Sequence, residues 1–196
     1  MEENNVTKKC SALFIGGSAG SLDVLLKVLP LLDPGIGFPV IIVLHRKPGA
    51  DYLLTSLLSS RSKLKVKEID EKENIDDGKI YLAPSDYHLL IEKNHTFSLD
   101  SSEKVNYSRP SIDVTFQSAS EVYKEKLVCF LLSGANNDGI EGLKEVKKNG
   151  GKVIIQHPES AAVSYMPAQA KLHVNNIDKI SKVEEMADYI NRLESL

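Results

Sequence analysis

Short apolar runs alternate with amphipathic stretches along most of this 196-residue chain. Apolar runs of this length, bounded by polar or turn residues, predict buried strands. They cover residues 10–15, 38–44, 66–69, 127–132 and 152–156. The pattern therefore predicts strands that are covered on both faces of a sheet.

Apolar residues spaced three and four apart predict helices between these strands. The predicted helices are residues 21–32, a helix beginning at Asp51, one capped by Ser111, one ending at Asn149-Gly150, and one opened by a capping box from Ser181 to Glu184. In the helix that begins at Asp51, Leu53, Leu54, Leu57 and Leu58 are expected to form one buried face.

The middle of the chain has a different pattern. Short strands at residues 79–83, 88–92 and 96–99 are joined by tight turns, which favours one or two antiparallel hairpins. The alternation of strands and helices elsewhere predicts an α/β fold with a doubly wound, mostly parallel sheet and an antiparallel hairpin region at one edge. Residues 9–196 are expected to form one domain after a polar tail at residues 1–8.

Composition excludes several classes of protein. The chain has 24 Lys and Arg against 27 Asp and Glu, and no Trp, so it offers no basic stripe or stacking surface for nucleic acid. Cys10 and Cys129 lie in apolar runs, which favours free buried thiols over a disulfide or a metal pair. No signal peptide and no apolar run of ~20 residues is present, so we expect a cytoplasmic protein without membrane insertion.

One glycine-rich turn suggests chemistry. Gly16-Gly17-Ser18-Ala19-Gly20 follows the first predicted strand and precedes the first predicted helix. Its G-x-S-x-G spacing in a strand–turn–helix context is that of a nucleophile elbow. A phosphate-binding turn and a turn shaped only by packing are the alternatives.

Ser18, His45 and Asp138 each follow a predicted strand directly. Because the carboxyl ends of parallel strands meet at one edge of a sheet, these three side chains are expected to form a nucleophile, a base and an orienting acid. Taken singly, each has a structural alternative as a helix cap, a strand terminus or a helix-dipole partner.

The chain has four other histidines. His88 and His95 belong to the hairpin region and are expected at the surface. His157 or His173 would complete an α/β-hydrolase type of triad, which ranks second because such folds place several strands before the elbow.

From about Ser11 onward the chain resembles the catalytic domain of the CheB-type chemotaxis protein-glutamate methylesterases. The resemblance rests on five segments besides the glycine turn: Leu44-His45, Ile80 to Pro84 with His88-Leu89, Arg109-Pro110-Ser111-Ile112-Asp113-Val114, Ser133 to Gly139, and Tyr165-Met166-Pro167. The segment beginning at Arg109 and the loop ending at Gly139 are the most specific of these.

The resemblance implies hydrolysis of glutamate γ-methyl esters on the cytoplasmic helices of chemoreceptors, with glutamine deamidation as a second reaction. It implies Ser18 as nucleophile, His45 as base and Asp138 as its orienting acid. The amides of Ala19 and Ala135 are then expected to hold the oxyanion. No cofactor and no metal is expected.

Three departures from the family pattern are visible. Ala19 stands where the family commonly has a Thr, and Ala135-Asn136 replace a Met and a Gly in the last loop. The family's usual N-terminal receiver domain is not among these residues. The chain is therefore expected to be constitutive, to answer to a separate regulator, or to be a shortened form.

Two other classes of function stay open at this point. A nucleotide-binding turn is one alternative, because Gly17-x-x-Gly20 matches part of its glycine pattern and basic residues follow His45. Ile15 stands where the first glycine of that pattern would be. A non-catalytic receptor-binding module of the same fold is the other alternative.

Overall fold

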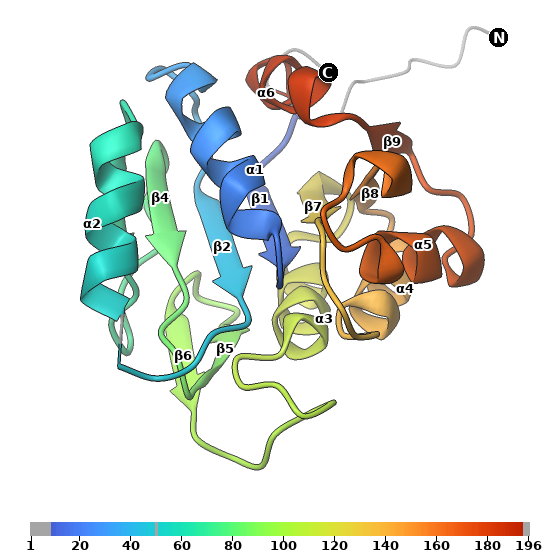
Figure 1. Cartoon of the computed structure of the whole chain (residues 1–196). Helices are drawn as coiled ribbons and strands as arrows, with labels where there is room; N and C mark the ends of the chain where they lie inside the picture. The colour runs from blue at the N-terminus through green and yellow to red at the C-terminus, as the bar shows by residue number, and fades with distance from the viewer. Residues whose placement is uncertain (1–8, 50, 194–196) are drawn as a thin grey trace, which may run out of the picture.

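The computed structural model describes residues 9–49 and 51–193, so the predicted tail at residues 1–8 lies outside the described part of the chain. Its centre is a sheet in which every pair of neighbouring strands is parallel, in the order β3-β4-β2-β1-β7-β8-β9 (Figure 1). The strands are β1 (Ala12–Gly17), β2 (Val40–Leu44), β3 (Lys65–Glu68), β4 (Lys79–Leu82), β7 (Leu127–Leu131), β8 (Lys152–Gln156) and β9 (Lys179–Ser181). Each predicted apolar run has become a strand of this sheet.

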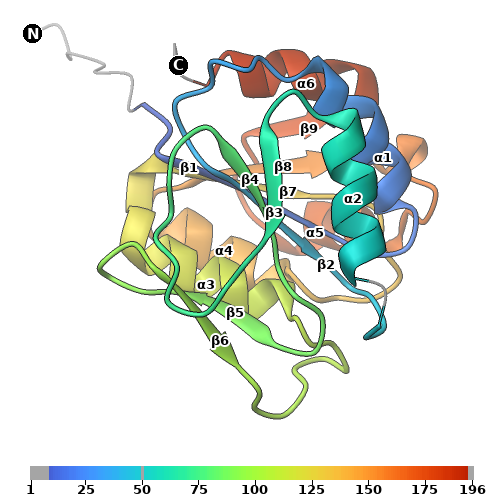
Figure 2. The same ribbon diagram turned by 90° about the vertical axis from the view of Figure 1, so that its left-hand side faces the viewer.

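Helices cover both faces of the sheet, with α1 and α2 on one side and α3 and α4 on the other (Figure 2). The helices are α1 (Ser21–Val28), α2 (Asp51–Arg61), α3 (Ile112–Tyr123), α4 (Ile140–Lys148), α5 (Tyr165–His173) and α6 (Val183–Asn191). Successive residues of a strand face opposite sides of a sheet. Leu13 and Ile15 of β1 accordingly enter one core, while Phe14 enters the other. The doubly wound α/β fold is confirmed.

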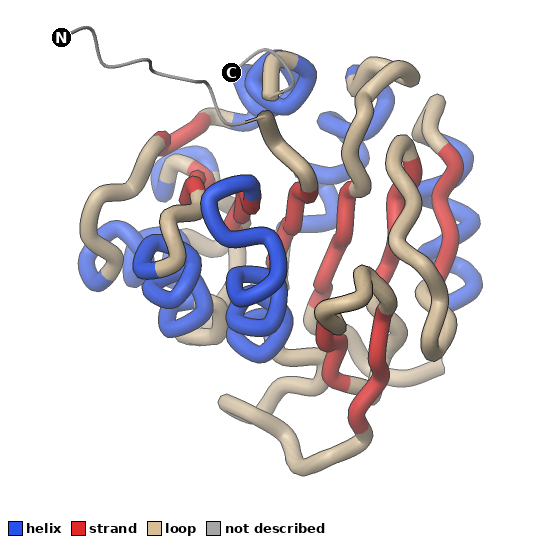
Figure 3. The backbone as a smooth tube through the Cα atoms, turned by 180° about the vertical axis from the view of Figure 1, so that it is seen from behind, coloured by secondary structure: helices blue, strands red, loops and turns tan. Residues whose placement is uncertain are grey.

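The predicted hairpin region is divided between two sheets. β4 joins the main sheet between β2 and β3, because Ile80, Tyr81 and Leu82 are buried. β5 (His88–Ile91) and β6 (Phe97–Asp100) form a separate antiparallel pair. This hairpin stands apart from the main sheet (Figure 3) and packs on α3, where Leu89 and Phe97 are buried.

Several predicted boundaries were wrong. The first helix ends at Val28 and continues as a 3₁₀ turn at Leu29–Leu31, because Pro30 has no N–H for the α-helical ladder. The predicted capping box is absent. Ser181 is taken by β9, where its hydroxyl donates to the Lys182 carbonyl, and α6 begins after Lys182. Helix α5 and strand β9 had no counterpart among the predicted elements.

The predicted apolar face of α2 was also wrong. Leu58 is fully buried, but Leu53 is 70% exposed and Leu57 is exposed too. Consecutive residues of a helix differ by 100° in direction, so residues 54 and 58 form one stripe and residues 53 and 57 the next. Only the first stripe meets the core.

Cys10 and Cys129 are both buried thiols, as predicted. Burial raises the pKa of the Cys129 thiol well above its ordinary value. Among residues 9–49 and 51–193, no helix has the length and apolar character needed to cross a bilayer.

We expect Gly16→Ala to destabilise the fold by about 1–3 kcal/mol through overpacking. A Cβ at residue 16 would lie 2.5 Å from Cγ2 of Ile112 and 3.0 Å from Cζ of Phe116, so β1 and α3 would have to separate. Urea unfolding measures the change. Gly35→Ala is the control, since a Cβ there meets only a side-chain oxygen of Asp33 at 3.3 Å. Equal unfolding free energies for the two variants would contradict this account.

Candidate active site

Three strand ends meet at the carboxyl edge of the sheet. β1 lies between β2 and β7, and the backbone contacts continue past the strands. The amide of His45 donates to the Gly17 carbonyl at 3.1 Å, and the amide of Ser18 donates to the Ser133 carbonyl at 2.9 Å. The predicted residues Ser18 and His45 are therefore neighbours across β1 and β2, as expected for parallel strands.

The glycine turn presents Ser18 between a strand and a helix. Gly20 has a φ of 82° and precedes the first residue of α1, so Ser18 itself is not the cap of that helix. The Ser18 carbonyl accepts hydrogen bonds from the amide and the hydroxyl of Ser21, which close the turn. In the described part of the chain, the Ser18 hydroxyl forms no hydrogen bond and is left for a reactant.

Close packing fixes the far side of Ser18. A Cβ added at Gly134 would lie 3.0 Å from the Ser18 Cβ and 2.5 Å from Cε of Met166. No other residue type fits between these two side chains without displacing one of them. The glycine of the loop after β7 thus allows that loop to approach the serine closely.

His45 and Asp138 form a short hydrogen bond. The distance from His45 Nε2 to Asp138 Oδ2 is 2.6 Å. The His45 side chain is 11% exposed and that of Asp138 is fully buried, so the bond is shielded from water on the side of the acid. Because Nε2 is engaged by the carboxylate, Nδ1 is the nitrogen of His45 that can act as a base.

The start of helix α3 holds the Asp138 carboxylate. Oδ1 accepts from the Ser111 hydroxyl at 2.8 Å and from the Asp113 amide at 3.0 Å, while Oδ2 accepts from the Ile112 amide at 2.7 Å. Helix N-termini favour anions because their first amides have no partner within the helix. Burial raises the pKa of Asp138, but the bonds from His45 and these amides outweigh it and leave that pKa below its usual range.

Asn136 is a site residue that the sequence did not reveal as such. Its Oδ1 accepts from the Asp138 amide at 3.2 Å, which turns its Nδ2 toward two groups. Nδ2 lies 3.4 Å from Nδ1 of His45 and 3.2 Å from Oγ of Ser108. The sequence marked Asn136 only as a departure from a family pattern. Its side chain reaches the nitrogen of His45 that is left for proton transfer.

Asp113 is a second buried acid that sequence reasoning missed. Asp113 belongs to the segment from Arg109 to Val114 that carries the family resemblance, and this was the only indication in the sequence that it lies near the site. Its Oδ1 accepts from the Gly142 amide at 2.7 Å, and its Oδ2 accepts from Asn106 Nδ2 at 3.1 Å. Burial raises the pKa of Asp113 to about 7 against the effect of the Gly142 amide, and the charge of Asp138 adds to the rise.

The remaining histidines do not bond to Asp138. His157 accepts from the Glu159 amide, and His173 contacts Gln169. His88 was expected at the surface and this was wrong, because it is only 1% exposed. Its Nδ1 accepts from the Ser111 amide at 3.2 Å and its Nε2 lies 2.9 Å from the Glu103 carbonyl, so it joins α3 to the preceding loop. His95 is exposed, as predicted.

Ala19 directly follows Ser18 in the chain, and Ala135 follows Gly134, which packs against Ser18. Both residues are exposed, and neither amide donates to another group within the described residues. The Ala19 amide shares its peptide plane with the Ser18 carbonyl, which accepts from Ser21, and the Ala135 amide shares its plane with the Gly134 carbonyl, which accepts from the Met166 amide at 3.0 Å. These bonds orient the two peptides. Two oriented amides with no partner in the described residues are what an oxyanion site requires.

Comparison with known protein families identifies the family to which this chain is related. The CheB methylesterase family model matches residues 13–190. The chain belongs to the CheB methylesterase family. The match covers both strand ends that carry Ser18 and His45, the Asp138 loop, and helices α1 to α5.

Individual relatives agree with this assignment. A protein of Leptospira interrogans, provisionally named a protein-glutamate methylesterase/protein-glutamine glutaminase, is 43% identical over 183 residues, which are 93% of this chain and 94% of that protein. Protein-glutamate methylesterase/protein-glutamine glutaminase 2 of Methanosarcina acetivorans is 35% identical over 98% of this chain and 56% of its own length.

A solved structure supports the fold directly. The crystal structure of the Thermotoga maritima CheB methylesterase catalytic domain matches with a TM-score of 0.89 and 32% identity, over 94% of this chain and 98% of that one. These findings do not favour the nucleotide-binding alternative.

The raised pKa of Asp113 predicts a pH dependence of stability. An aspartate in an unfolded chain titrates near pH 4, so between about pH 4 and 7 the folded state holds one more proton. The stabilisation of the folded state by this proton is fully present below pH 4 and is lost as the pH rises to about 7. The unfolding free energy then falls by at most about 1.4 kcal/mol per pH unit.

Asp113→Asn removes that titration. We expect the unfolding free energy of the variant minus that of the unmodified chain to rise from pH 4 to 7 and then level off. Urea unfolding across that pH range measures this difference. Asp188→Asn, at an exposed aspartate of α6, is the control. Parallel curves for Asp113→Asn and the unmodified chain would contradict the assignment.

Proposed function

We propose that this chain is a serine carboxyl-esterase that hydrolyses glutamate γ-methyl esters on chemoreceptor proteins and releases methanol. The observation that carries the proposal is the 2.6 Å bond between His45 and the buried Asp138, beside a glycine turn that presents Ser18. The names of the relatives, protein-glutamate methylesterases, support glutamyl methyl esters of a protein as the substrate class. A soluble receptor region in the cytoplasm is then the place of action.

The proposed reaction has two halves. Ser18 Oγ attacks the ester carbonyl while Nδ1 of His45 takes its proton, and Asp138 stabilises the charged ring. The tetrahedral oxyanion accepts from the amides of Ala19 and Ala135, with the N-terminus of α1 behind them. The protonated ring then gives its proton to the departing methoxide, so methanol leaves and a glutamyl ester of Ser18 remains.

Water completes the cycle. His45 takes a proton from water, the hydroxide attacks the glutamyl ester, and Ser18 leaves with the proton. Glutamate and free enzyme are the products, and no cofactor or metal enters. With a glutamine side chain the same first half would release ammonia, which is the proposed deamidase reaction. Asn136 acts as a positioning residue because its amide keeps Nδ1 of His45 an acceptor.

Regulation is part of the proposal. A separate regulator that contacts the strand-end face of the sheet would control access to Ser18. Such a partner would act without entering the core, since the catalytic groups lie in the turns after β1, β2 and β7.

Ser18→Ala and His45→Gln should each lower methanol release from a methylated receptor fragment by on the order of 10⁴-fold, because each removes a group that the first half requires. A fluorophosphonate probe should label the unmodified chain and leave Ser18→Ala unlabelled. Ser60→Ala, at an exposed serine of α2, is the matched control and should retain activity. Full methanol release by folded Ser18→Ala would refute the nucleophile, and an unlabelled native chain would favour a non-catalytic receptor-binding module.

A further inference from the structure

A cavity of about 340 Å³ opens beside His45, and Asp138 is not among its lining residues. Its lining includes His45, Lys47, Lys104, Tyr107 and Arg109. The first two follow β2, and the others belong to the segment between β6 and α3. The cavity thus shares the proposed base with the reaction site and extends toward the loop that precedes α3.

The charges of this cavity are unbalanced. Four of its lining residues are Lys or Arg, and Asp86 is the one carboxylate in the lining. That carboxylate is already bound, since Arg109 donates to Asp86 Oδ1 at 2.7 Å from Nη2 and 3.1 Å from Nε. Arg46 is already paired with Glu68 at 3.5 Å and donates to the Ala83 carbonyl at 2.8 Å. The lining therefore attracts an anion more than a neutral group.

Lys47 and Lys104 are the available cations. Arg109 also donates to the carbonyls of Ser101 and Ser102, at 2.6 and 2.7 Å, so its guanidinium braces the loop. Both lysines are exposed, and among the described residues neither ammonium group forms an ion pair or hydrogen bond. Two lysines from separate segments thus border one cavity with no anion bound to either.

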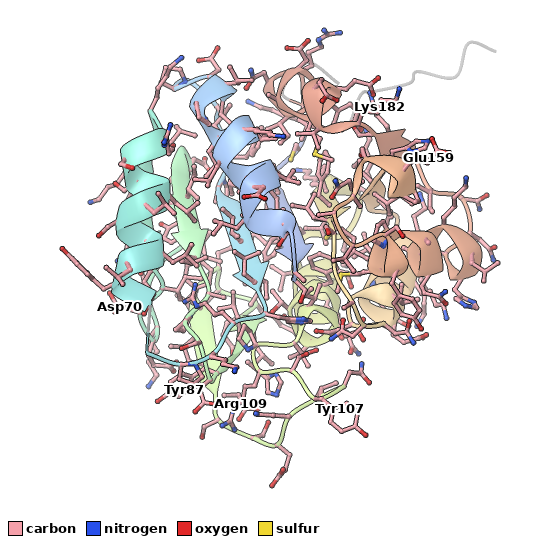
Figure 4. All side chains as sticks on the ribbon, in the orientation of Figure 1. Asp70, Tyr87, Tyr107, Arg109, Glu159 and Lys182 are labelled. Atoms are coloured by element: carbon pink, nitrogen blue, oxygen red, sulfur yellow. The ribbon has the colours of Figure 1, made fainter. Side chains whose placement is uncertain are left out.

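The loop beside the cavity also presents an aromatic ring. Tyr107 is 99% exposed and has a φ of 62°, directly after Asn106 at 49°. Left-handed conformations at two successive non-glycine residues are costly and persist where the surroundings impose them. Two backbone hydrogen bonds close this turn, from the Val105 amide to the Ser108 carbonyl at 3.2 Å and from the Ser108 amide to the Val105 carbonyl at 2.9 Å. They hold Asn106 and Tyr107 in this conformation. Figure 4 shows Tyr107 and Arg109 at the end of the molecule where this loop lies.

We propose that this cavity binds a carboxylate of the substrate protein, a Glu or Asp side chain near the methylated glutamate, with Lys47 and Lys104 as its cations and Tyr107 against the adjoining residues. The inference rests on the proposed function and adds a preference for acidic sequence around the ester. Each hydrolysis leaves a new carboxylate on the substrate, so a segment with several such glutamates becomes a better ligand as the reaction proceeds.

The test uses two synthetic peptides that carry one glutamyl methyl ester, flanked either by glutamates or by glutamines. The unmodified chain should show a lower KM for the acidic peptide, and added salt should reduce that advantage. In the double variant Lys47→Gln/Lys104→Gln, KM for the acidic peptide should rise about three- to tenfold with kcat unchanged. KM for the glutamine-flanked peptide should stay the same.

Controls separate charge from folding. Lys27→Gln/Lys148→Gln removes two exposed lysines from the last turns of α1 and α4 and should change neither KM. Tyr107→Ala should raise KM for both peptides, whereas Tyr107→Phe should restore it. Equal KM values for the two peptides, or no effect of the Lys47 and Lys104 changes, would overturn the inference.

Direct binding keeps this result distinct from the proposed function. Fluorescence anisotropy of a labelled, unesterified acidic peptide measures its Kd without any turnover. Absence of methanol release from either peptide would refute the esterase alone. A Kd for the acidic peptide that the Lys47→Gln/Lys104→Gln change leaves unaltered would refute the cavity assignment, whether or not the chain is active.

Discussion

A buried carboxylate is stable only when it is bonded on all sides, and Asp138 meets this requirement by joining two parts of the molecule. Oδ1 accepts from the Ser111 hydroxyl and the Asp113 amide, while Oδ2 is shared by the Ile112 amide and His45. The loop after β7, the start of α3 and the end of β2 are therefore fixed to one another. Removal of that single charge would leave a helix terminus and an imidazole without their common partner.

This arrangement also explains why a second acid lies so close by. Asp113 provides one of the amides that bind Asp138, so its own carboxyl is carried into the same interior region. Two adjacent buried carboxylates do not both ionise easily, and their environments separate them. Asp138 has the helix amides and His45, whereas Asp113 has mainly the Gly142 amide and burial, which raises its pKa to about 7. The helix terminus thus assigns the negative charge to the residue that orients the histidine.

The residues around the site are of two kinds: buried residues held by hydrogen bonds and packing, and residues exposed to solvent. Ser18, His45 and Asp138 are held by strand ends and by α3, and Gly134 allows the loop after β7 to touch the serine. The loop between β6 and α3 is braced by Arg109 and by His88 but leaves Tyr107 and Lys104 exposed. The proposed chemistry and the proposed recognition therefore lie on neighbouring segments with different degrees of burial. This separation permits binding residues to change without disturbing the catalytic groups.

The sequence alone determined the alternation of strands and helices up to β8 and the placement of Ser18, His45 and Asp138 after strands, because local apolar periodicity encodes both. It did not predict α5 or β9. It did not reveal that Asn136 reaches His45, that Asp113 shares the interior with Asp138, or that His88 is buried. These contacts join residues that are distant along the chain, and only packing brings them within hydrogen-bond range. The same reason underlies the errors at β4, α2 and Ser181, where pairing and burial in the folded sheet overrode a local signal.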